Sequence, residues 1–168
     1  MLTIQLTPFS ADSPLLDEAV KLSIAEWPAP EDQIHGFIAR YATLPDFRGL
    51  IALVDGEPAG MGFGVRSLPG NWWHDRVAEQ VGADHPALQD AWVLVSLVMR
   101  PALRNHGIGA ALLDALLATQ PCPRTLLSTQ VANTGAQQFY TRHGWRILHP
   151  GFVFTPGQEP FVVMQRER

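Results

Sequence analysis

The stretch that decides the fold is Val98-Met99-Arg100-Pro101-Ala102-Leu103-Arg104-Asn105-His106-Gly107-Ile108-Gly109-Ala110. It joins the most apolar strand pattern of the chain, Ala91 to Met99, to a helical pattern that begins at Gly107. A helix N-terminus behind such a loop favours an anion, because its first-turn N–H groups and its dipole both attract negative charge. Gly107 and Gly109 also let phosphate oxygens approach the backbone. The alternative, an ordinary strand-to-helix turn, needs only one glycine.

Three phosphate-binding patterns compete for this loop. A dinucleotide-binding fold needs a glycine or alanine three residues after the second glycine, where this chain has Leu112. A P-loop ends in Gly-Lys-Ser or Gly-Lys-Thr, and the one lysine of this chain is the distant Lys21. The third pattern, Arg/Gln-x-x-Gly-x-Gly/Ala after a strand, is matched in full by Arg104 to Gly109.

A second segment follows after one more strand pattern: Asn133-Thr134-Gly135-Ala136-Gln137-Gln138-Phe139-Tyr140-Thr141-Arg142-His143-Gly144-Trp145. Together the two segments resemble the GNAT superfamily of acetyl-CoA-dependent N-acetyltransferases, with Trp145 in the place of a family Phe. The resemblance covers about residues 47–148 clearly and the N-terminal part by element order. It implies an α/β fold with a central mixed sheet of about six to seven strands, splayed at its centre and flanked by about four helices.

Alternation, apolar spacing and chain breakers predict the individual elements. We expect strands over residues 3–6, 50–54, 59–65, 91–99, 125–129, 145–148 and 161–165. We expect helices over residues 14–26, 33–43, 73–81, 107–119 and 134–143. Asp55-Gly56 indicates a hairpin turn, and the glycines of residues 59–65 indicate close approach by a neighbouring segment.

The resemblance assigns acetyl-CoA as the acetyl donor. The pantetheine arm is expected between the strands 91–99 and 125–129, with its amides on the backbone of Val98, Met99 and Arg100. The pyrophosphate is expected on the N–H groups of the loop and helix start, namely Arg104, Asn105, His106, Gly107, Ile108, Gly109 and Ala110. Asn133 matches a family residue that contacts pantetheine, although it also suits the cap of the helix that follows.

Tyr140 is the predicted catalytic residue, since its family counterpart protonates the departing CoA thiolate. A phenol of pKa ~10 is neutral at pH 7 and suited to that step; the alternative is a core aromatic beside Phe139. Many relatives place a Glu on the central strand as base, but residues 91–99 contain no carboxylate. Glu26, His74, His85 and Asp90 are the remaining candidates, acting through water, and surface positions are the simpler interpretation of each.

The charge distribution indicates where an acceptor amine binds. Residues 1–90 carry 13 acidic and 5 basic side chains, a balance of −8, whereas residues 91–168 carry 3 and 7, a balance of +4. In the family the acceptor side comes largely from the N-terminal part, so a cationic small molecule or peptide amine is expected there. Predicted acceptor contacts are Trp27, Trp72, Trp73 and Asp90, with core positions as the alternative for the tryptophans.

Length and composition set the remaining expectations. A chain of 168 residues predicts a single N-acetyltransferase domain, with acceptor-side elements over about 1–90 and an acetyl-CoA core over about 91–148. The net charge of −4 argues against nucleic acid, and no apolar run is long enough for a membrane. One cysteine, Cys122, and no secretion signal predict a cytoplasmic protein. The histidine spacing predicts no metal, and analogy suggests a homodimer.

Two alternatives to an acetyltransferase stay open at this point. The first is a non-catalytic acyl-CoA-binding module that senses the cofactor, which the missing strand carboxylate favours. The second is an acyltransferase with a longer acyl-CoA donor, because the sequence does not show the depth of the pocket. The presence of Tyr140 favours an enzyme.

Overall fold

A computed structural model describes all 168 residues, and the chain forms two compact units. The first unit comprises Met1–Val65 and Leu94–Gln120, and the second comprises Arg66–Val93 and Pro121–Arg168. The strands are β1 (Ile4–Pro8), β2 (Arg48–Val54), β3 (Glu57–Ser67), β4 (Ala91–Met99), β5 (Arg124–Gln130), β6 (Arg146–Phe152) and β7 (Phe161–Glu167). The helices are α1 (Leu15–Glu26), α2 (Glu31–Tyr41), α3 (Trp72–Val81), α4 (Ile108–Thr119) and α5 (Thr134–Arg142), with 3-10 turns η1 (Pro86–Leu88) and η2 (Pro101–Leu103).

The strand order is β1-β2-β3-β4-β5-β7-β6 in one mixed sheet of seven strands. Five α-helices accompany it, which confirms the predicted α/β class. The two units do not coincide with the predicted division near residue 90, because β3 and β4 each run from one unit into the other. The single domain therefore stays a prediction. None of the helices is long and apolar enough to span a membrane.

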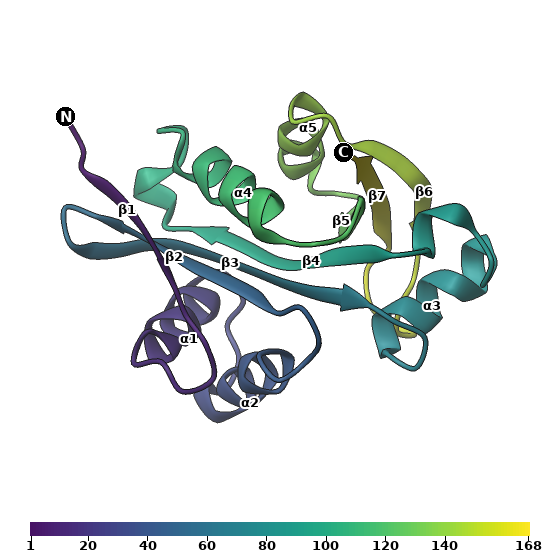
Figure 1. Cartoon of the computed structure of the whole chain (residues 1–168), viewed down its shortest axis with the longest axis horizontal. Coiled ribbons are helices and arrows are strands. Elements are labelled where there is room, and N and C mark those ends of the chain that lie inside the picture. The colour runs from purple at the N-terminus through teal and green to yellow at the C-terminus, as the bar shows by residue number, and fades with distance from the viewer. The chain divides into compact units, whose positions relative to one another are not determined.

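In the first unit, helices cover both faces of the strands. Helices α1 and α2 lie on one face of β2 and β3, and α4 lies on the other (Figure 1). The α1–α2 face buries a cluster that includes Leu16, Ile38 and Phe63. The α4 face buries another, which includes Ala52 and Ile108. Both faces of these strands are apolar because both are covered.

Strands β2 and β3 form the antiparallel hairpin that the sequence predicted. Asp55 and Gly56 have φ of 51° and 86°, the left-handed pair that a tight hairpin turn requires. Gly60 and Gly62 are explained by their neighbours. A Cβ at Gly60 would lie 2.8 Å from the carbonyl oxygen of Val98, and one at Gly62 would lie 2.8 Å from a methyl of Leu116. Glycine at these positions lets β4 and α4 pack closely on β3.

The second unit holds the other half of the sheet. The start of β4 pairs with β5 in parallel, with Val93 opposite Leu126. Strand β7 then lies antiparallel to β5 on one side and to β6 on the other. The sequence predicted the end of β6 at Leu148, but the strand continues to Phe152 with two irregularities of register. An edge strand tolerates the proline at position 150, because that residue lacks only an N–H group.

Candidate active site

The loop between β4 and α4 is built to present backbone N–H groups. Asn105 and Gly107 adopt φ of 64° and 79°, so left-handed residues alternate with right-handed ones, as they do in anion-binding nests. Gly107 is the N-cap of α4, and no side chain caps the helix there. Ile108 anchors the first turn, because its side chain is buried with Ala52 and Leu112. The first-turn N–H groups are therefore held in place without a side-chain partner.

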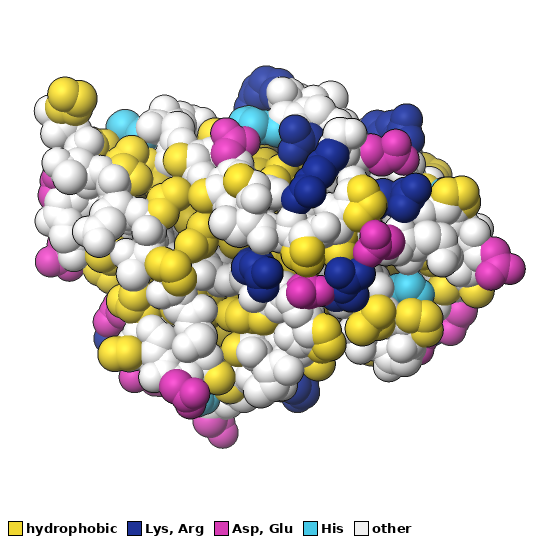
Figure 2. All heavy atoms as spheres, in the orientation of Figure 1, with side chains coloured by type: hydrophobic (Ala, Val, Ile, Leu, Met, Phe, Trp, Pro, Cys, Tyr) yellow, Lys and Arg dark blue, Asp and Glu magenta, His cyan; other side chains and the backbone are white.

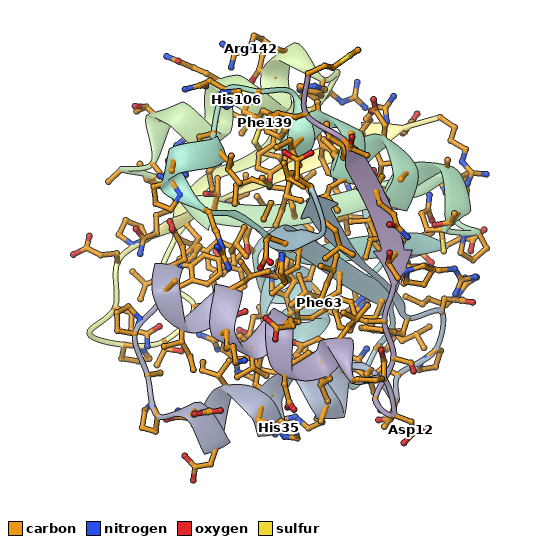
Figure 3. All side chains as sticks on the ribbon, turned by 90° about the vertical axis from the view of Figure 1, so that its left-hand side faces the viewer. Asp12, His35, Phe63, His106, Phe139 and Arg142 are labelled. Atoms are coloured by element: carbon orange, nitrogen blue, oxygen red, sulfur yellow. The ribbon has the colours of Figure 1, made fainter.

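The loop also fixes two charged or polar side chains. The guanidinium of Arg104 donates a hydrogen bond of 2.7 Å to the carboxylate of Glu26, at the end of α1. The ring nitrogen Nδ1 of His106 lies 2.8 Å from the carbonyl oxygen of Arg104. Figure 3 shows His106 on this loop, far from Phe63, which lies in the layer next to α1 and α2. The first turn of α4 contains no acidic residue, so the loop is suited to an anion.

At the end of β4 the backbone has two different edges. The N–H of Arg100 donates to the carbonyl oxygen of Ala59 in β3 at 2.8 Å. Since successive N–H groups of a strand point to opposite edges, the Met99 N–H points away from β3. The Arg100 carbonyl accepts a hydrogen bond from Leu103 at 2.9 Å. Of the three predicted pantetheine positions, Arg100 thus has both of its backbone groups in hydrogen bonds within the chain.

Strand β4 is irregular just before that end. Val95 packs in the cluster under α1 and α2, and Ser96 lines a cavity on the same face. Leu97 packs in the α4 cluster, Val98 returns to the α1–α2 side, and Met99 is again on the α4 side. Two adjacent side chains on one face are the mark of a β-bulge. Ser96 is thus a lining residue on the α1–α2 side, and its hydroxyl oxygen is buried without a hydrogen bond.

The cavity has a volume of about 200 Å³ and lies within the first unit. It is lined by Trp27, which the sequence predicted as an acceptor contact, and by α1, α2, β3 and β4. The sequence also offered Phe37 as a lesser candidate for a pocket wall, but it missed the other lining residues, which are Ser23, Ile34, Ile38, Phe63, Val95 and Ser96. For the residues on α1 and α2 the available signal is apolar helical spacing, which indicates a core face rather than a cavity.

In the second unit, Tyr140 lies on α5 and is 9% exposed. Its ring packs edge-on against Phe139 and Trp145, at centroid distances of 5.2 and 5.7 Å. Burial raises the pKa of the Tyr140 phenol above its ordinary value. The phenol is therefore fully protonated at neutral pH, as a proton donor must be. It is also a weaker acid than the free phenol that the sequence suggested.

Asn133 caps α5, as the alternative interpretation expected. Its side-chain oxygen accepts a hydrogen bond of 3.1 Å from the Ala136 N–H. Gln137, one turn into the helix, donates to the carbonyl oxygens of Gln130 and Val131 at 3.2 and 2.8 Å. These bonds fix the turn between β5 and α5. Asn133 is exposed, and the cap fixes the orientation of its side-chain amide.

The other predicted acceptor contacts lie in the second unit. Trp72 is 57% exposed, and its ring lies 5.7 Å from that of Phe154. Trp73 stacks near the same ring, and its indole N–H donates to the Ser128 hydroxyl of β5 at 3.0 Å. Asp90 forms an ion pair with Arg66. Trp73 is a packed residue with a satisfied N–H, whereas Trp72 leaves most of its ring at the surface.

All four water-mediated base candidates have structural partners in this molecule, Asp90 through its ion pair with Arg66. Glu26 pairs with Arg104, and His85 accepts a hydrogen bond from Ala87 at the cap of η1. His74 was expected at the surface, but it is 4% exposed on the inner side of α3, with its Nδ1 2.8 Å from the Ser67 hydroxyl oxygen. Burial lowers the pKa of His74, and Asp75 raises it to a lesser extent. His74 precedes the buried Val77 by three residues, which places both side chains on one face of α3. This spacing was the signal from which the burial of His74 could have been predicted.

No three His, Cys, Asp or Glu side chains come together as they would around a metal ion. Cys122, the one cysteine of the chain, is fully buried. A thiol in such a position behaves as a small apolar side chain.

Comparison with known families identifies a relationship over most of the chain. The family model described as "Acetyltransferase (GNAT) family" matches residues 16–145. A curated protein of Mycobacterium tuberculosis, named a GCN5-like protein acetyltransferase, is 28% identical over 117 residues. That match covers 64% of this chain and 57% of the relative. The chain thus spans less than two thirds of that relative's length.

Solved structures share the fold at low sequence identity. An aminoglycoside 6'-acetyltransferase type Ii has a TM-score of 0.70 and 18% identity, covering 97% of this chain and 96% of that one. An acetyltransferase of the GNAT family from Bacillus cereus has a TM-score of 0.71 and 16% identity, covering 99% and 98%. A chain of the NatC complex bound to Gag peptide and CoA has a TM-score of 0.70 and 15% identity, covering 98% of both.

Proposed function

The chain belongs to the GNAT family of acetyltransferases, and we propose that it transfers the acetyl group of acetyl-CoA directly to a primary amine. The observation that carries the proposal is the β4–α4 loop, where two left-handed residues and an uncapped helix start present N–H groups to an anion. The NatC relative of the same fold is bound to CoA. Arg104 adds a side-chain cation to the same loop.

The loop fits a pyrophosphate on steric grounds as well. Nothing lies within 4 Å of the Cβ position of Gly107, so the surface in front of the helix start is open. We assign the pyrophosphate to residues 104–110 and the pantetheine amides to Val98 and Met99. Bound acetyl-CoA supplies the activated acetyl group. The Met99 N–H, which points away from β3, is the group that we assign to the thioester carbonyl oxygen.

Tyr140 is our proposed general acid. As the amine nitrogen bonds to the carbonyl carbon and the C–S bond breaks, Tyr140 donates its proton to the sulfur that leaves. The new amide nitrogen releases its surplus proton to water, and the Tyr140 phenolate regains one from water. Its raised pKa keeps that proton in place between turnovers. The ammonium form of the amine loses its proton to water, since β4 contains no carboxylate. Asn133 holds the start of the Tyr140 helix and is our candidate for a pantetheine contact.

The acceptor is an amine that carries positive charge in solution. Helices α1 and α2 together carry five acidic and two basic side chains. Figure 2 shows Asp and Glu side chains along the lower edge of the molecule, where α1 and α2 lie. Such a surface raises the local concentration of a cation. The relatives named for an aminoglycoside and for a bound peptide indicate two chemical sources of such amines.

Calorimetric titration with acetyl-CoA, and separately with CoA, tests the donor site. We expect saturable binding that is lost in Gly107→Glu, because the new carboxylate repels phosphate at the helix start. Gly157→Glu is the matched control, since Gly157 also has a positive φ and open space at its Cβ position. A folded wild type that binds neither molecule would contradict the proposal.

Turnover then separates an enzyme from a binding module. Release of CoA thiol in the presence of a panel of primary amines is expected for an acetyltransferase. Tight CoA binding without turnover on any amine would favour the non-catalytic module. Propionyl-CoA and longer donors in the same assay measure the acyl-chain preference. A cytoplasmic location and a homodimer remain predictions of the sequence.

A further inference from the structure

The chemistry of the cavity between α1, α2 and the strands differs from the acidic surface around it. Six of its lining residues are apolar: Trp27, Ile34, Phe37, Ile38, Phe63 and Val95. The other two are Ser23 and Ser96, so no charged side chain lines the cavity. A charged group that entered it would lose its hydration without gaining an ion-pair partner. The interior therefore selects an uncharged, mainly apolar group.

One polar residue that lines this cavity, Ser96, has a buried hydroxyl with no partner in the chain. Ser96 is 8% exposed, and its hydroxyl oxygen makes no hydrogen bond. The great majority of buried side-chain polar atoms in proteins have at least one hydrogen-bond partner. Ser96 lines the cavity next to Val95, which packs in the cluster under α1 and α2. A bound molecule with one hydrogen-bonding group near its apolar part would satisfy it.

The size of the cavity limits what it holds. An apolar cavity of about 150 Å³ binds a benzene molecule in another protein, so about 200 Å³ holds one aromatic ring or a branched aliphatic group with a few further atoms. Phe37 and Trp27 are 37% and 52% exposed. Both side chains therefore reach from the cavity to the surface, which leaves the charged end of an amphipathic molecule in water.

We propose that this cavity binds the apolar substituent of the acceptor, and that the preferred acceptors are arylalkylamines or branched alkylamines rather than polyamines or aminoglycosides. The inference rests on the proposed acetyltransferase function and names its substrate class. Ser96 donates a hydrogen bond to the polar group next to that substituent. The acidic surface of α1 and α2 attracts the amine, and the cavity selects its side chain.

The test compares 2-phenylethylamine and isopentylamine with putrescine as acceptors, by release of CoA thiol. We expect kcat/KM for 2-phenylethylamine to exceed that for putrescine by about tenfold or more, the range that a hydrophobic pocket supplies. Ile34→Trp fills the cavity from α2 and is expected to lower kcat/KM for 2-phenylethylamine by about tenfold or more. Ile24→Trp is the matched control, since Ile24 packs on the same core cluster without lining the cavity. Ser23→Leu fills the cavity from α1 if Ile34→Trp fails to fold.

Calorimetry keeps this inference separate from the proposed function. Titration with CoA tests the donor site, and titration with 2-phenylethylamine tests the cavity without any turnover. If CoA binds and 2-phenylethylamine does not, the apolar acceptor class is wrong and the acetyltransferase proposal stands. If CoA does not bind, both proposals fall. Preference for putrescine, or equal activity of Ile34→Trp and Ile24→Trp on 2-phenylethylamine, also overturns the inference.

Discussion

The guanidinium of Arg104 donates a 2.7 Å hydrogen bond to the carboxylate of Glu26, although 78 residues separate them in the chain. The side chains are 46% and 36% exposed, so water screens their attraction and the pair adds little to stability, ~1 kcal/mol or less. Its importance is functional, because Arg104 belongs to the proposed pyrophosphate loop. Glu26 competes with a phosphate group for the same cation.

Glu26→Gln is therefore expected to tighten CoA binding about two- to fivefold, the equivalent of a surface ion pair. The variant frees Arg104 for phosphate and removes a nearby negative charge. Calorimetric titration with CoA at low salt measures the change. Glu18→Gln is the control, because Glu18 lies on the same helix and pairs with Lys21 instead. Weaker binding in Glu26→Gln would mean that Glu26 positions Arg104 rather than competing for it.

Gly107→Ala and Gly36→Ala form a pair that isolates the backbone requirement of the loop. Neither Cβ position has an atom within 4 Å, but only Gly107 has a positive φ. Gly107→Ala should cost about 1–2 kcal/mol of stability and weaken CoA binding about tenfold as the loop relaxes. Gly36→Ala, within α2, should stabilise the fold by ~0.4–1 kcal/mol and leave CoA binding unchanged. Urea unfolding and calorimetry decide; equal effects of the two variants would count against a conformational role of Gly107.

Tyr140→Phe should lower turnover by about 10²-fold or more, as loss of a general acid does, with little change in CoA binding. Tyr41→Phe is the natural control, since the chain has only these two tyrosines and burial raises the pKa of each. Because the Tyr140 pKa lies above its ordinary ~10, the wild-type rate should show no falling limb from this group up to about pH 10. Full activity of Tyr140→Phe would exclude it as the acid.

His74 should make the protein less stable in acid. Burial lowers its pKa below the usual 6.5, so the unfolded chain binds the proton more readily than the folded one. The stability that the neutral ring contributes is present above pH 6.5 and is lost as the pH falls through the folded-state pKa. Urea unfolding at pH 7.5 and 5.5 should show a smaller loss in His74→Gln than in wild type or in His35→Gln. His35 serves as the exposed control.

Ser96→Ala and Ser67→Ala should change stability in opposite directions. Both serines are buried, at 8% and 4% exposure, but only Ser67 has a hydrogen-bond partner, the ring of His74. Removing the unpartnered Ser96 hydroxyl should stabilise the free protein by about 1 kcal/mol, whereas removing the Ser67 hydroxyl should cost about 1 kcal/mol. Chemical denaturation of the two variants measures this. A destabilised Ser96→Ala would show that the hydroxyl is satisfied in the free protein.

The local patterns of the sequence predicted the elements well where the pattern was complete. Ala91 to Met99 was predicted with its observed bounds, because an apolar run is stopped by Arg100-Pro101. The turn at Asp55-Gly56 was predicted from residue types that suit a positive φ. The helix was expected to begin at Gly107, which is the N-cap of α4. The end of β6 was missed, because Pro150-Gly151 is also typical of a loop.

The cavity could not be predicted in the same way. Trp27 was chosen as an aromatic near the acceptor side, but its neighbours in the cavity come from α2, β3 and β4. Val95 and Ser96 both line the cavity although they are neighbours in β4, and no residue type in Val95-Ser96-Leu97 encodes this by itself. Side-chain direction after a β-bulge follows from packing on both faces of the sheet, and packing is not a local property.

Gly60 and Gly62 in β3 carry a consequence for protein engineering. A methyl group at Gly60 would meet the carbonyl oxygen of Val98 at 2.8 Å, so the backbone of β4 would have to move. That segment carries Met99, to which we assign the donor carbonyl. A directed-evolution library aimed at new acceptors can therefore randomise the cavity walls, but it should hold Gly60 and Gly62 constant. At Gly60 the addition of a single carbon atom would displace the strand that carries the reaction centre, whereas at Gly62 it would first press on the methyl groups of Leu116 and Leu97.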